Sequence, residues 1–345
     1  MAGRLRFPLA AALAATLLTA CTAAAPPAGR RVPAAASLAE SAPTPAVVAQ
    51  RALSGVLWVD AAMGELWRID AETGAAQRAA IPGGARATQP AVTPDCATQA
   101  WMTAARRADG AFDDRYGIAV QGAPALTATA SFGYADPALS PDGRVLFATR
   151  LAFDGDGLRS DVVRVALDGA AAPQLIVADA VQPSVSPDGR RLVYVALDAA
   201  NAPVIAQRLV VRDIAGGAES SLFPAGRFLE IFGPRWLDAE RIVFAALEDE
   251  SVGRAPTPLD VLFGASVARA HSRAGHVWVV RADGSDLRRL TAEALESPVV
   301  APAPDGSAVA VLADESVYAI GIDDAAMRRI VDVGGGGGLA WCRAQ

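Results

Sequence analysis

The aspartates and histidines are the side chains with which this chain could perform acid–base or metal chemistry. Asp142, Asp188 and Asp305 each lie between a proline and a glycine. Aspartate is favoured in such turns because its carboxylate accepts hydrogen bonds from the turn's own backbone. We therefore interpret these three residues as turn residues rather than as catalytic acids. The two histidines, His271 and His276, are too few for a histidine-based metal cluster, and we expect both in loops or at a rim.

The sequence Asp-Gly-Asp-Gly at 154–157, with Asp161 nearby, has part of a calcium-loop pattern. It lacks the glutamate at the twelfth position and does not follow a helix, so we expect a solvated loop there. The chain also contains no Gly-X-Ser-X-Gly or His-Glu-X-X-His motif and no phosphate-binding glycine loop before a helix. The sequence therefore predicts no metal site, no cofactor and no catalytic residue.

The N-terminal residues have the pattern of an export signal. Arg4 and Arg6 precede an apolar stretch at 9–18 that is too short to span a bilayer stably. The sequence Leu-Thr-Ala-Cys then ends at Cys21 and resembles the lipobox of bacterial lipoproteins. We predict that residues 1–20 are a signal peptide and that Cys21 becomes the lipidated first residue. The alternative is an ordinary secretory signal with a chance cysteine.

The residues after Cys21 contain Ala, Pro, Ser and Thr without an apolar period. This composition predicts a disordered tether over 21–52. A lipidated cysteine carries two or more acyl chains, which suffice for stable anchoring. We therefore expect an extracytoplasmic protein that is attached to a membrane through Cys21.

A turn sequence recurs along the rest of the chain. Its clearest copies are PALSPDG at 137–143 and PSVSPDG at 183–189, each followed by an apolar run. The weaker copies are PAVTPDC at 90–96, PRWLDAE at 234–240, VVAPAPDG ending at 306 and LAWCRAQ at 339–345. The last residues of successive copies are 47, 46, 51, 66 and 39 positions apart. A repeat period in the forties is typical of stacked supersecondary units.

Each unit is expected to contain four antiparallel strands, the first before the turn and the second after it. We expect third strands at 161–167, 207–212, 276–280 and 316–320, and fourth strands at 174–177, 287–290 and 327–331. Repeated four-stranded units predict a β-propeller. The alternative is a β-sandwich whose hairpins use Asp-Gly turns, but a sandwich would not keep a fixed period.

The first and last segments of the folded part together supply the strands of one complete blade. Residues 55–81 supply a second, third and fourth strand without a first, and residues 339–345 supply only a first strand. We therefore predict an all-β, six-bladed β-propeller of four-stranded antiparallel blades over 53–345. Its closing blade is shared by the N- and C-terminal strands, which removes the open edge between the first and last blades.

Cys96 and Cys342 are the two cysteines besides Cys21. An exported protein occupies a compartment that permits disulfides. Cys96 ends the first hairpin of blade two, and Cys342 lies in the first strand of the neighbouring closing blade. A disulfide between them would fix the C-terminal strand, and the alternative is two free thiols.

All six tryptophans fall inside expected strands. Trp236 and Trp341 occupy the same position of the repeat, shortly before the turn. Aromatic side chains at that position would pack between neighbouring blades, whereas a sugar-binding platform would place them on loops. We therefore expect the tryptophans in the core.

Blade five contains an insertion within 244–276, and repeat proteins place such excess residues in loops that often carry function. The insertion joins an acidic start to an apolar stretch at 259–267. We predict that it contacts a partner through Glu248, Asp249, Glu250, Leu262 and Phe263. The alternative is that its apolar residues pack back onto the propeller rim.

The charge of the chain limits the kinds of partner. The net charge is −6 at pH 7, which is incompatible with a broad basic surface. Nucleic acid is therefore excluded as a partner, because phosphate binding needs clustered positive charge. We expect a monomer that binds an unknown protein or peptide of the cell envelope.

The copies PALSPDGRVLFATR and PSVSPDGRRLVYVAL resemble the repeat of the TolB-type, WD40-like propeller family. The resemblance covers 53–345 and implies a propeller that binds partner proteins. The lipobox together with this propeller also resembles the C-terminal part of the actinobacterial LpqB lipoproteins, although only the tether precedes the first blade here. Neither resemblance supplies a catalytic residue, because the repeat motif is structural.

Two functional hypotheses follow. The first is a membrane-anchored binding or scaffold module that holds a protein or peptide on a propeller face or in the central channel. The second is a propeller enzyme of the lactonase, sugar-dehydrogenase or peptidase-associated type. Such an enzyme would need carboxylates, asparagines or histidines that converge at the mouth of the channel.

Overall fold

The computed structural model describes residues 52–61, 65–81, 85–105, 107, 109–112, 115–121, 123–154, 157–169, 172–198, 206–248, 274–333 and 337–343. The chain divides into two compact units, Met1–Gln50 and Arg51–Gln345, and the described residues belong to the second. Cys21, His271, and the insertion residues Asp249, Glu250, Leu262 and Phe263 lie outside the described residues. Within the described ranges there is no helix that could cross a membrane.

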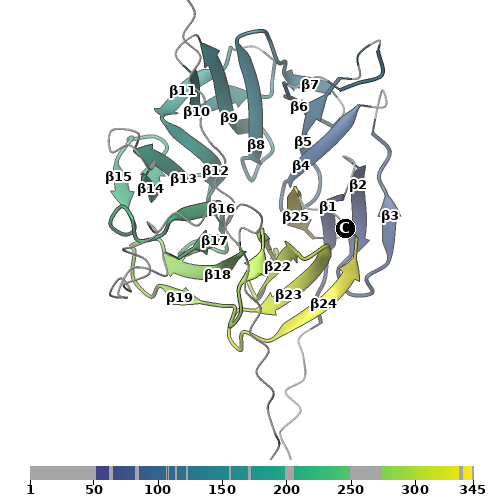
Figure 1. Ribbon diagram of the computed structural model, residues 1–345, viewed down its shortest axis with the longest axis vertical. Coiled ribbons are helices and arrows are strands. Elements are labelled where there is room, and N and C mark those ends of the chain that lie inside the picture. The colour runs from purple at the N-terminus through teal and green to yellow at the C-terminus, as the bar shows by residue number, and fades with distance from the viewer. Residues whose placement is uncertain are drawn as a thin grey trace, which may run out of the picture. The chain divides into compact units, whose positions relative to one another are not determined.

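The second unit is a six-bladed β-propeller, as predicted, and each blade is an antiparallel sheet of four strands (Figure 1). Blade one contains β25 (Gly338–Cys342), β1 (Val56–Ala61), β2 (Glu65–Asp70) and β3 (Ala76–Arg78). Blade two contains β4 (Arg86–Val92), β5 (Gln99–Ala104), β6 (Gly117–Val120) and β7 (Ala123–Leu126). Blade three contains β8 (Phe132–Leu139), β9 (Val145–Asp154), β10 (Gly157–Ala166) and β11 (Gln174–Ala178).

The remaining blades follow the same order. Blade four contains β12 (Ala180–Val185), β13 (Arg191–Asp198), β14 (Ala206–Asp213) and β15 (Glu219–Ser221). Blade five contains β16 (Glu230–Trp236), β17 (Arg241–Leu247), β18 (Ala274–Arg281) and β19 (Arg288–Arg289), and β20 (Leu295–Glu296) also pairs with β18. Blade six contains β21 (Val299–Pro302), β22 (Ala308–Ala313), β23 (Ser316–Gly321) and β24 (Met327–Asp332).

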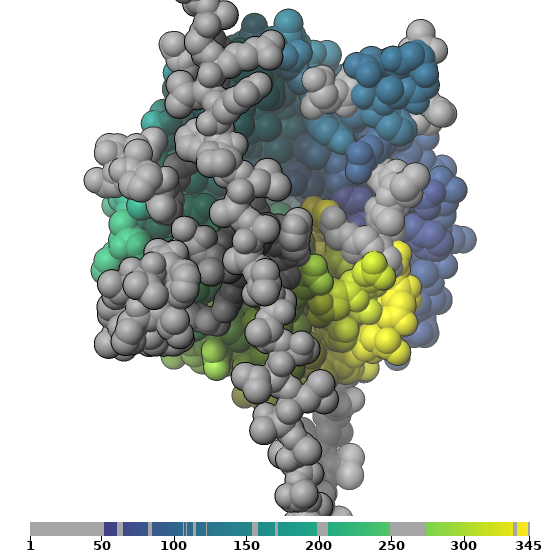
Figure 2. All heavy atoms as spheres, viewed as in Figure 1, coloured from purple at the N-terminus to yellow at the C-terminus, as the bar shows by residue number. Residues whose placement is uncertain are grey.

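The closing blade joins both ends of the folded unit. Strand β25 pairs antiparallel with β1, with Leu57 opposite Trp341 and Val59 opposite Leu339. The last strands lie directly against the first ones, seen as yellow beside purple in Figure 2. The structure also joins Cys96 to Cys342 in a disulfide, with their Cα atoms 5.3 Å apart. A backbone pairing and a covalent bond therefore both tie the C-terminal strand into the ring.

The repeated Pro-Asp-Gly sequences form the turns between the first and second strands. In blade three, Ser140 Oγ donates to Asp142 Oδ1 at 2.6 Å, and the Arg144 N–H donates to the same oxygen at 3.1 Å. These two bonds lower the pKa of the Asp142 carboxyl. Asp188 accepts the equivalent bond from Ser186, whereas Asp305 accepts a hydroxyl bond from Ser307, two residues after it. The interpretation of the three aspartates as turn residues is therefore confirmed.

The core lies between neighbouring blades. Trp236 of β16 is buried, and its Nε1 donates to the Ser184 carbonyl oxygen of β12 at 3.1 Å. Around it, Val193 and Leu209 of blade four pack with Phe244 of blade five. Trp101, Trp278 and Trp341 are buried as well, whereas Trp58 and Trp67 are half-buried. The expected role of the tryptophans in packing is thus confirmed most clearly at Trp236.

Candidate functional site: the central channel

A β-bulge interrupts the innermost strand in each of blades two to five. The pairing with the second strand shifts between Thr88 and Ala91, and at the three equivalent places of the next blades. Each bulge consists of one residue and the proline after it, and proline suits this place because it has no N–H to leave unpaired. The residues before the prolines have left-handed backbones, with φ values of 47° at Gln89, 50° at Asp136, 56° at Gln182 and 48° at Gly233.

These bulges line one end of the central channel. A cavity of about 200 Å³ lies among them, and all six blades contribute to its lining. Blade six supplies Ser297, which also has a left-handed backbone and also precedes a proline, and blade one supplies Gly337 and Gly338. A side chain on Gly338 would clash with the Gln89 backbone, since an added Cβ would lie 2.4 Å from the Gln89 Cα. The glycine therefore lets the closing strand approach blade two.

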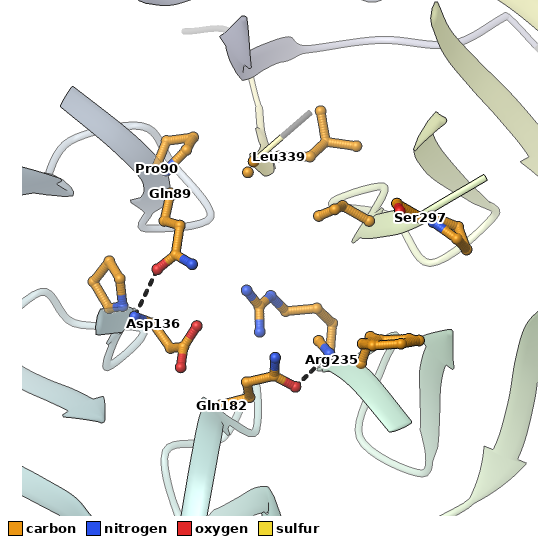
Figure 3. A pocket seen from close by; sticks show the side chains of 14 residues that line it. Gln89, Pro90, Asp136, Gln182, Arg235, Ser297 and Leu339 are labelled. Atoms are coloured by element: carbon orange, nitrogen blue, oxygen red, sulfur yellow. Dashed lines mark hydrogen bonds between the residues drawn. The ribbon is translucent and has the colours of Figure 1, made fainter. Parts of the chain in front are cut away.

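Side chains from one blade accept hydrogen bonds from the bulge N–H groups of the next blade. This pattern occurs at four successive junctions: between blades one and two, two and three, three and four, and four and five. The bonds run from Gln89 N to Asp60 Oδ2 (3.4 Å), from Asp136 N to Gln89 Oε1 (2.8 Å), from Gln182 N to Thr149 Oγ1 (3.0 Å) and from Gly233 N to Gln182 Oε1 (2.8 Å). Because Gln89 and Gln182 use their amide oxygens in this way, their NH₂ groups face the channel (Figure 3).

Asp136 brings a carboxylate to the cavity. Thr149 Oγ1 donates to its Oδ2 at 2.8 Å, and hydrogen bonding from the Gln182 N–H and the Gln89 side chain also favours its charged form. Burial raises the pKa of the Asp136 carboxyl, against the opposing effects of the Thr149 bond and of the positive charge of Arg235. The carboxylate therefore has a strong tendency to find a donor or a positive charge in the cavity.

Arg235 brings the opposite charge. Its guanidinium extends into the middle of the channel between Gln89, Asp136 and Gln182 (Figure 3). It donates one hydrogen bond to the described part of the chain, from Nη1 to the Pro234 carbonyl oxygen at 3.1 Å. Burial lowers the pKa of the guanidinium, and the negative charge of Asp136 opposes this effect. Among the described residues, no direct ion pair within 4 Å joins the two groups, although each is sensitive to the other's charge.

The position of Arg235 in the repeat is normally occupied by a small residue. Arg235 pairs with Val243, as Ala138 pairs with Phe147 in blade three. The equivalent residues of the other blades are Ala91, Ala138, Ser184, Ala301 and Ala340. A charged side chain at this level of the channel is therefore a departure from the repeat and not part of its framework.

A second cavity, of about 360 Å³, lies at the end of the channel where the Pro-Asp-Gly turns gather. Its lining is mainly proline, alanine, valine and leucine, together with the buried Trp236 and Trp341. Arg235 lines both cavities, so its side chain lies where they meet. The channel thus has a polar end at the bulges and an apolar end at the turns.

Among the described residues, the polar end has the donors and acceptors of a binding site. It offers donors from Arg235, Gln89, Gln182 and Ser297, and a single carboxylate acceptor, Asp136. Among the described residues that line the cavity there is no histidine. His276 is on β18, where its Nδ1 lies 3.2 Å from Thr291 Oγ1. Among the described residues, no group of three or more His, Cys, Asp or Glu side chains could hold a metal ion.

Of the five predicted contact residues of the insertion, the structure describes only Glu248. Glu248 is half-buried after β17 and pairs with Arg227 at 3.4 Å and with Arg289 at 3.8 Å. The other predicted contact residues of the insertion lie outside the described residues, and so do positions 155 and 156 of the partial calcium pattern. Glu248 is not among the described residues that line the polar cavity.

The repeat pattern does not include most of the cavity residues, because its clearest copies start at a proline. The residue before that proline carries the bulge and faces the channel, as at Gln89, Asp136 and Gln182. A second signal was present in the copy PRWLDAE, where arginine follows the proline in place of alanine or serine. Residues that break a repeat at a fixed position thus mark the site better than residues that conform to it.

Comparison with known proteins identifies the fold. No protein-family model and no curated protein matches this sequence. The structure is similar to TolB from Acinetobacter baumannii, with 15% identity and a TM-score of 0.58 over 84% of this chain and 66% of TolB. It is also similar to a putative TolB from Agrobacterium tumefaciens, with 15% identity and a TM-score of 0.51 over 73% of this chain and 83% of that protein.

A chain of the Nidogen/Laminin complex is similar as well, at 12% identity and a TM-score of 0.55 over 85% of this chain and 99% of that one. Because these identities are low, the similarities show the propeller fold and no more. They agree with the TolB-type resemblance of the repeat at the level of the fold. The resemblance to LpqB lipoproteins stays a prediction.

Proposed function

We propose that this protein is an exported, lipid-anchored β-propeller that binds a protein or peptide at the cell envelope, with the polar end of the channel as its binding site. One observation carries this proposal. A guanidinium and a carboxylate, each with donors or acceptors unused by the described chain, face each other in a cavity to which all six blades contribute. Concave sites with a few convergent polar groups are the usual place for a ligand.

Membrane attachment is the second part of the proposal, and it is supported by the lipobox sequence that ends at Cys21. Replacing Cys21 with Ser should abolish lipidation, so that the protein is released from membranes or stays unprocessed. Membrane fractionation with immunoblotting measures this directly. Mature, processed protein that remains in the membrane fraction would refute the lipid anchor.

Binding through the channel is tested by capture of partners from detergent-solubilised membranes. The bait is the mature lipoprotein, and the matched variant is Gly233→Asn. An added Cβ at Gly233 meets no atom within 4 Å, and the φ of 48° is one that asparagine tolerates. The substitution should therefore fill part of the cavity without disturbing the fold.

We expect the wild-type protein to retain a specific protein or peptide that Gly233→Asn fails to retain. A partner retained equally by both would mean that a propeller face or the blade-five insertion binds it instead. Failure of the wild type to retain any specific partner would contradict the proposed function.

A further inference from the structure

We propose that the polar cavity binds the C-terminal end of a peptide, with Arg235 as the ligand of the carboxylate and Asp136 as the acceptor for the last backbone N–H. This inference rests on the proposed function and specifies its ligand. The cavity would recognise a carboxylate together with an N–H donor on the neighbouring α-carbon. A free amino acid offers the same chemistry, so the experiment below includes one.

The guanidinium supplies the carboxylate site. Arginine has five N–H donors in a planar fork, and a carboxylate can accept two of them in parallel. In this structure the described chain uses one of these donors, in the bond from Nη1 to Pro234. The NH₂ groups of Gln89 and Gln182 face the same space, because their oxygens are engaged by the neighbouring blades. A carboxylate beside Arg235 would therefore be surrounded by donors.

The carboxylate of Asp136 restricts which anionic ligands fit the cavity. Among the described residues that line the cavity, one group is positive and one is negative, so a dianion such as phosphate would be repelled by Asp136 and would bring it no further donor. A peptide end is matched to this arrangement, since it has a single negative charge and, on its last residue, an N–H donor. The carboxylate of Asp136 is the acceptor for that donor, because its two oxygens together have about four acceptor sites. The Thr149 hydroxyl, the Gln182 N–H and the Gln89 side chain use at most three of them.

The walls of the cavity determine the last side chain. Pro90, Phe232, Pro298, Val299 and Leu339 line it between the polar groups. These residues present apolar surface, so an apolar C-terminal side chain would be favoured. A volume of about 200 Å³ is below the range of about 300–1,000 Å³ that is usual for drug-sized ligands. The cavity therefore fits a chain end and not a folded element.

Two N-acetylated libraries of short random peptides provide the probe, one with free C-terminal acids and one with C-terminal amides. Each is equilibrated with the mature lipoprotein in detergent, and mass spectrometry identifies the retained peptides. A retained peptide is then resynthesised in both forms, labelled at its N-terminus, and titrated by fluorescence anisotropy. Free leucine serves as a competitor, to separate recognition of an amino acid from recognition of a peptide.

Three proteins are compared. Arg235→Ala removes the carboxylate ligand and introduces the residue that the repeat already has at Ala91 and Ala138, so the fold accommodates it. Arg78→Ala is the control, because Arg78 is an exposed arginine of β3 that pairs with Glu65 at 2.8 Å. Thermal unfolding of all three proteins establishes that each is folded.

We expect the wild type and Arg78→Ala to retain acids that end in an apolar residue. The amide should bind about 10–100-fold more weakly, and Arg235→Ala should lose the same factor for the acid, as expected for charge-assisted hydrogen bonds. Equal retention of acids and amides would overturn the carboxylate assignment and leave peptide binding in place. The proposal of a peptide end as the ligand would also be overturned if no peptide were retained. The same holds if free leucine displaced the peptide with an affinity equal to the peptide's own. Capture of partners from solubilised membranes tests the proposed function independently of the peptide experiment.

Discussion

The two ends of the central channel are built from the same six strands, but their residues recur from blade to blade at one end and vary at the other. At the turn end, Ser140, Ser186 and their aspartates repeat from blade to blade and satisfy one another's hydrogen bonds. At the bulge end, the equivalent positions are occupied by glutamine, aspartate, glycine and serine. The turn end also contains the buried Trp236 and the apolar cavity, whereas the bulge end contains the opposed charges of Asp136 and Arg235.

This difference indicates which residues of a repeat protein can form a binding site. Residues that recur are used to form the blade, and a change there would cost stability in that blade. The bulge residues protrude into the channel and differ from blade to blade, although the Gln89 and Gln182 side chains also accept an N–H of the next blade. Their charges are costly to bury and contribute little to the fold, which is the pattern expected of a binding site. The following predictions test this division.

The largest effect should come from removing residues 339–345, because both ends of the channel depend on closure of the ring. This truncation takes away almost all of β25 and exposes the edge of β1. Open edges of this kind promote aggregation. We expect the truncated protein to be aggregated or unfolded in size-exclusion chromatography and circular dichroism. A monomer with an unchanged melting temperature would show that the closing strand is dispensable.

Reduction of the disulfide should be the next largest effect, and it acts at the turn end. Cys96 takes the place of the turn glycine of other blades, with a φ of 60°, and its bond to Cys342 spans 246 residues of sequence. Loss of a native disulfide typically costs about 2–5 kcal/mol. Denaturant unfolding with and without a reductant measures this cost, and Cys96→Ser is the control on which the reductant should have no further effect. An equal response of both proteins would exclude the bond.

At the bulge end, Asp60 should make stability depend on pH. Burial raises the pKa of its carboxyl to about 6 from 3.8, although the Gln89 N–H and the charge of Arg86 act against the rise. The folded state therefore binds a proton more tightly than the unfolded state does. The resulting stability is complete below about pH 4 and is lost as the pH rises through about 6, a total of about 3 kcal/mol.

Asp60→Asn removes this titration and keeps an oxygen that can accept the bonds from Thr88 and Gln89. Urea unfolding between about pH 4 and pH 7 should therefore show the wild type losing about 2.4 kcal/mol relative to the variant. Parallel curves for the two proteins would show that Asp60 is not protonated in this range.

A smaller effect is expected from Ser186→Ala at the turn end. Ser186 is fully buried, donates to Asp188 and accepts the Arg191 N–H at 2.9 Å. Blade six has Ala303 at this position, so the turn can form without the hydroxyl. We expect a loss of about 1 kcal/mol in the free energy of unfolding. Ser297→Ala at the bulge end is the control, and its stability should not change. A loss of equal size in both variants would contradict the distinction between the ends.

The blades were predictable from the sequence because a propeller blade is a local unit. Its turns are marked by Pro-Asp-Gly, and its strands follow as apolar runs, as in Val145–Asp154 after the turn at Asp142. Closure was predictable because the strand missing before Val56 is supplied at Leu339. Both inferences need only the order of elements along the chain.

The channel site was not predictable in the same way, because a bulge is a property of two paired strands. A residue before proline is expected to be extended, whereas Gln89, Asp136 and Gln182 are left-handed. Only the shifted pairing with the second strand shows that they face the channel. Likewise, the arginine of PRWLDAE is recognisable as an exception in sequence, but its proximity to Asp136 depends on closure of the ring.

The most direct test of the division between the two ends measures stability and partner binding together in Gly233→Asn and Ser186→Ala. The unfolding free energy is obtained by urea denaturation and partner binding by capture from solubilised membranes. The account predicts that Gly233→Asn loses binding and keeps its stability to within about 0.5 kcal/mol. It predicts that Ser186→Ala loses about 1 kcal/mol of stability and retains the partner. If Gly233→Asn kept full binding while Ser186→Ala lost it, the bulge end would not be the binding site.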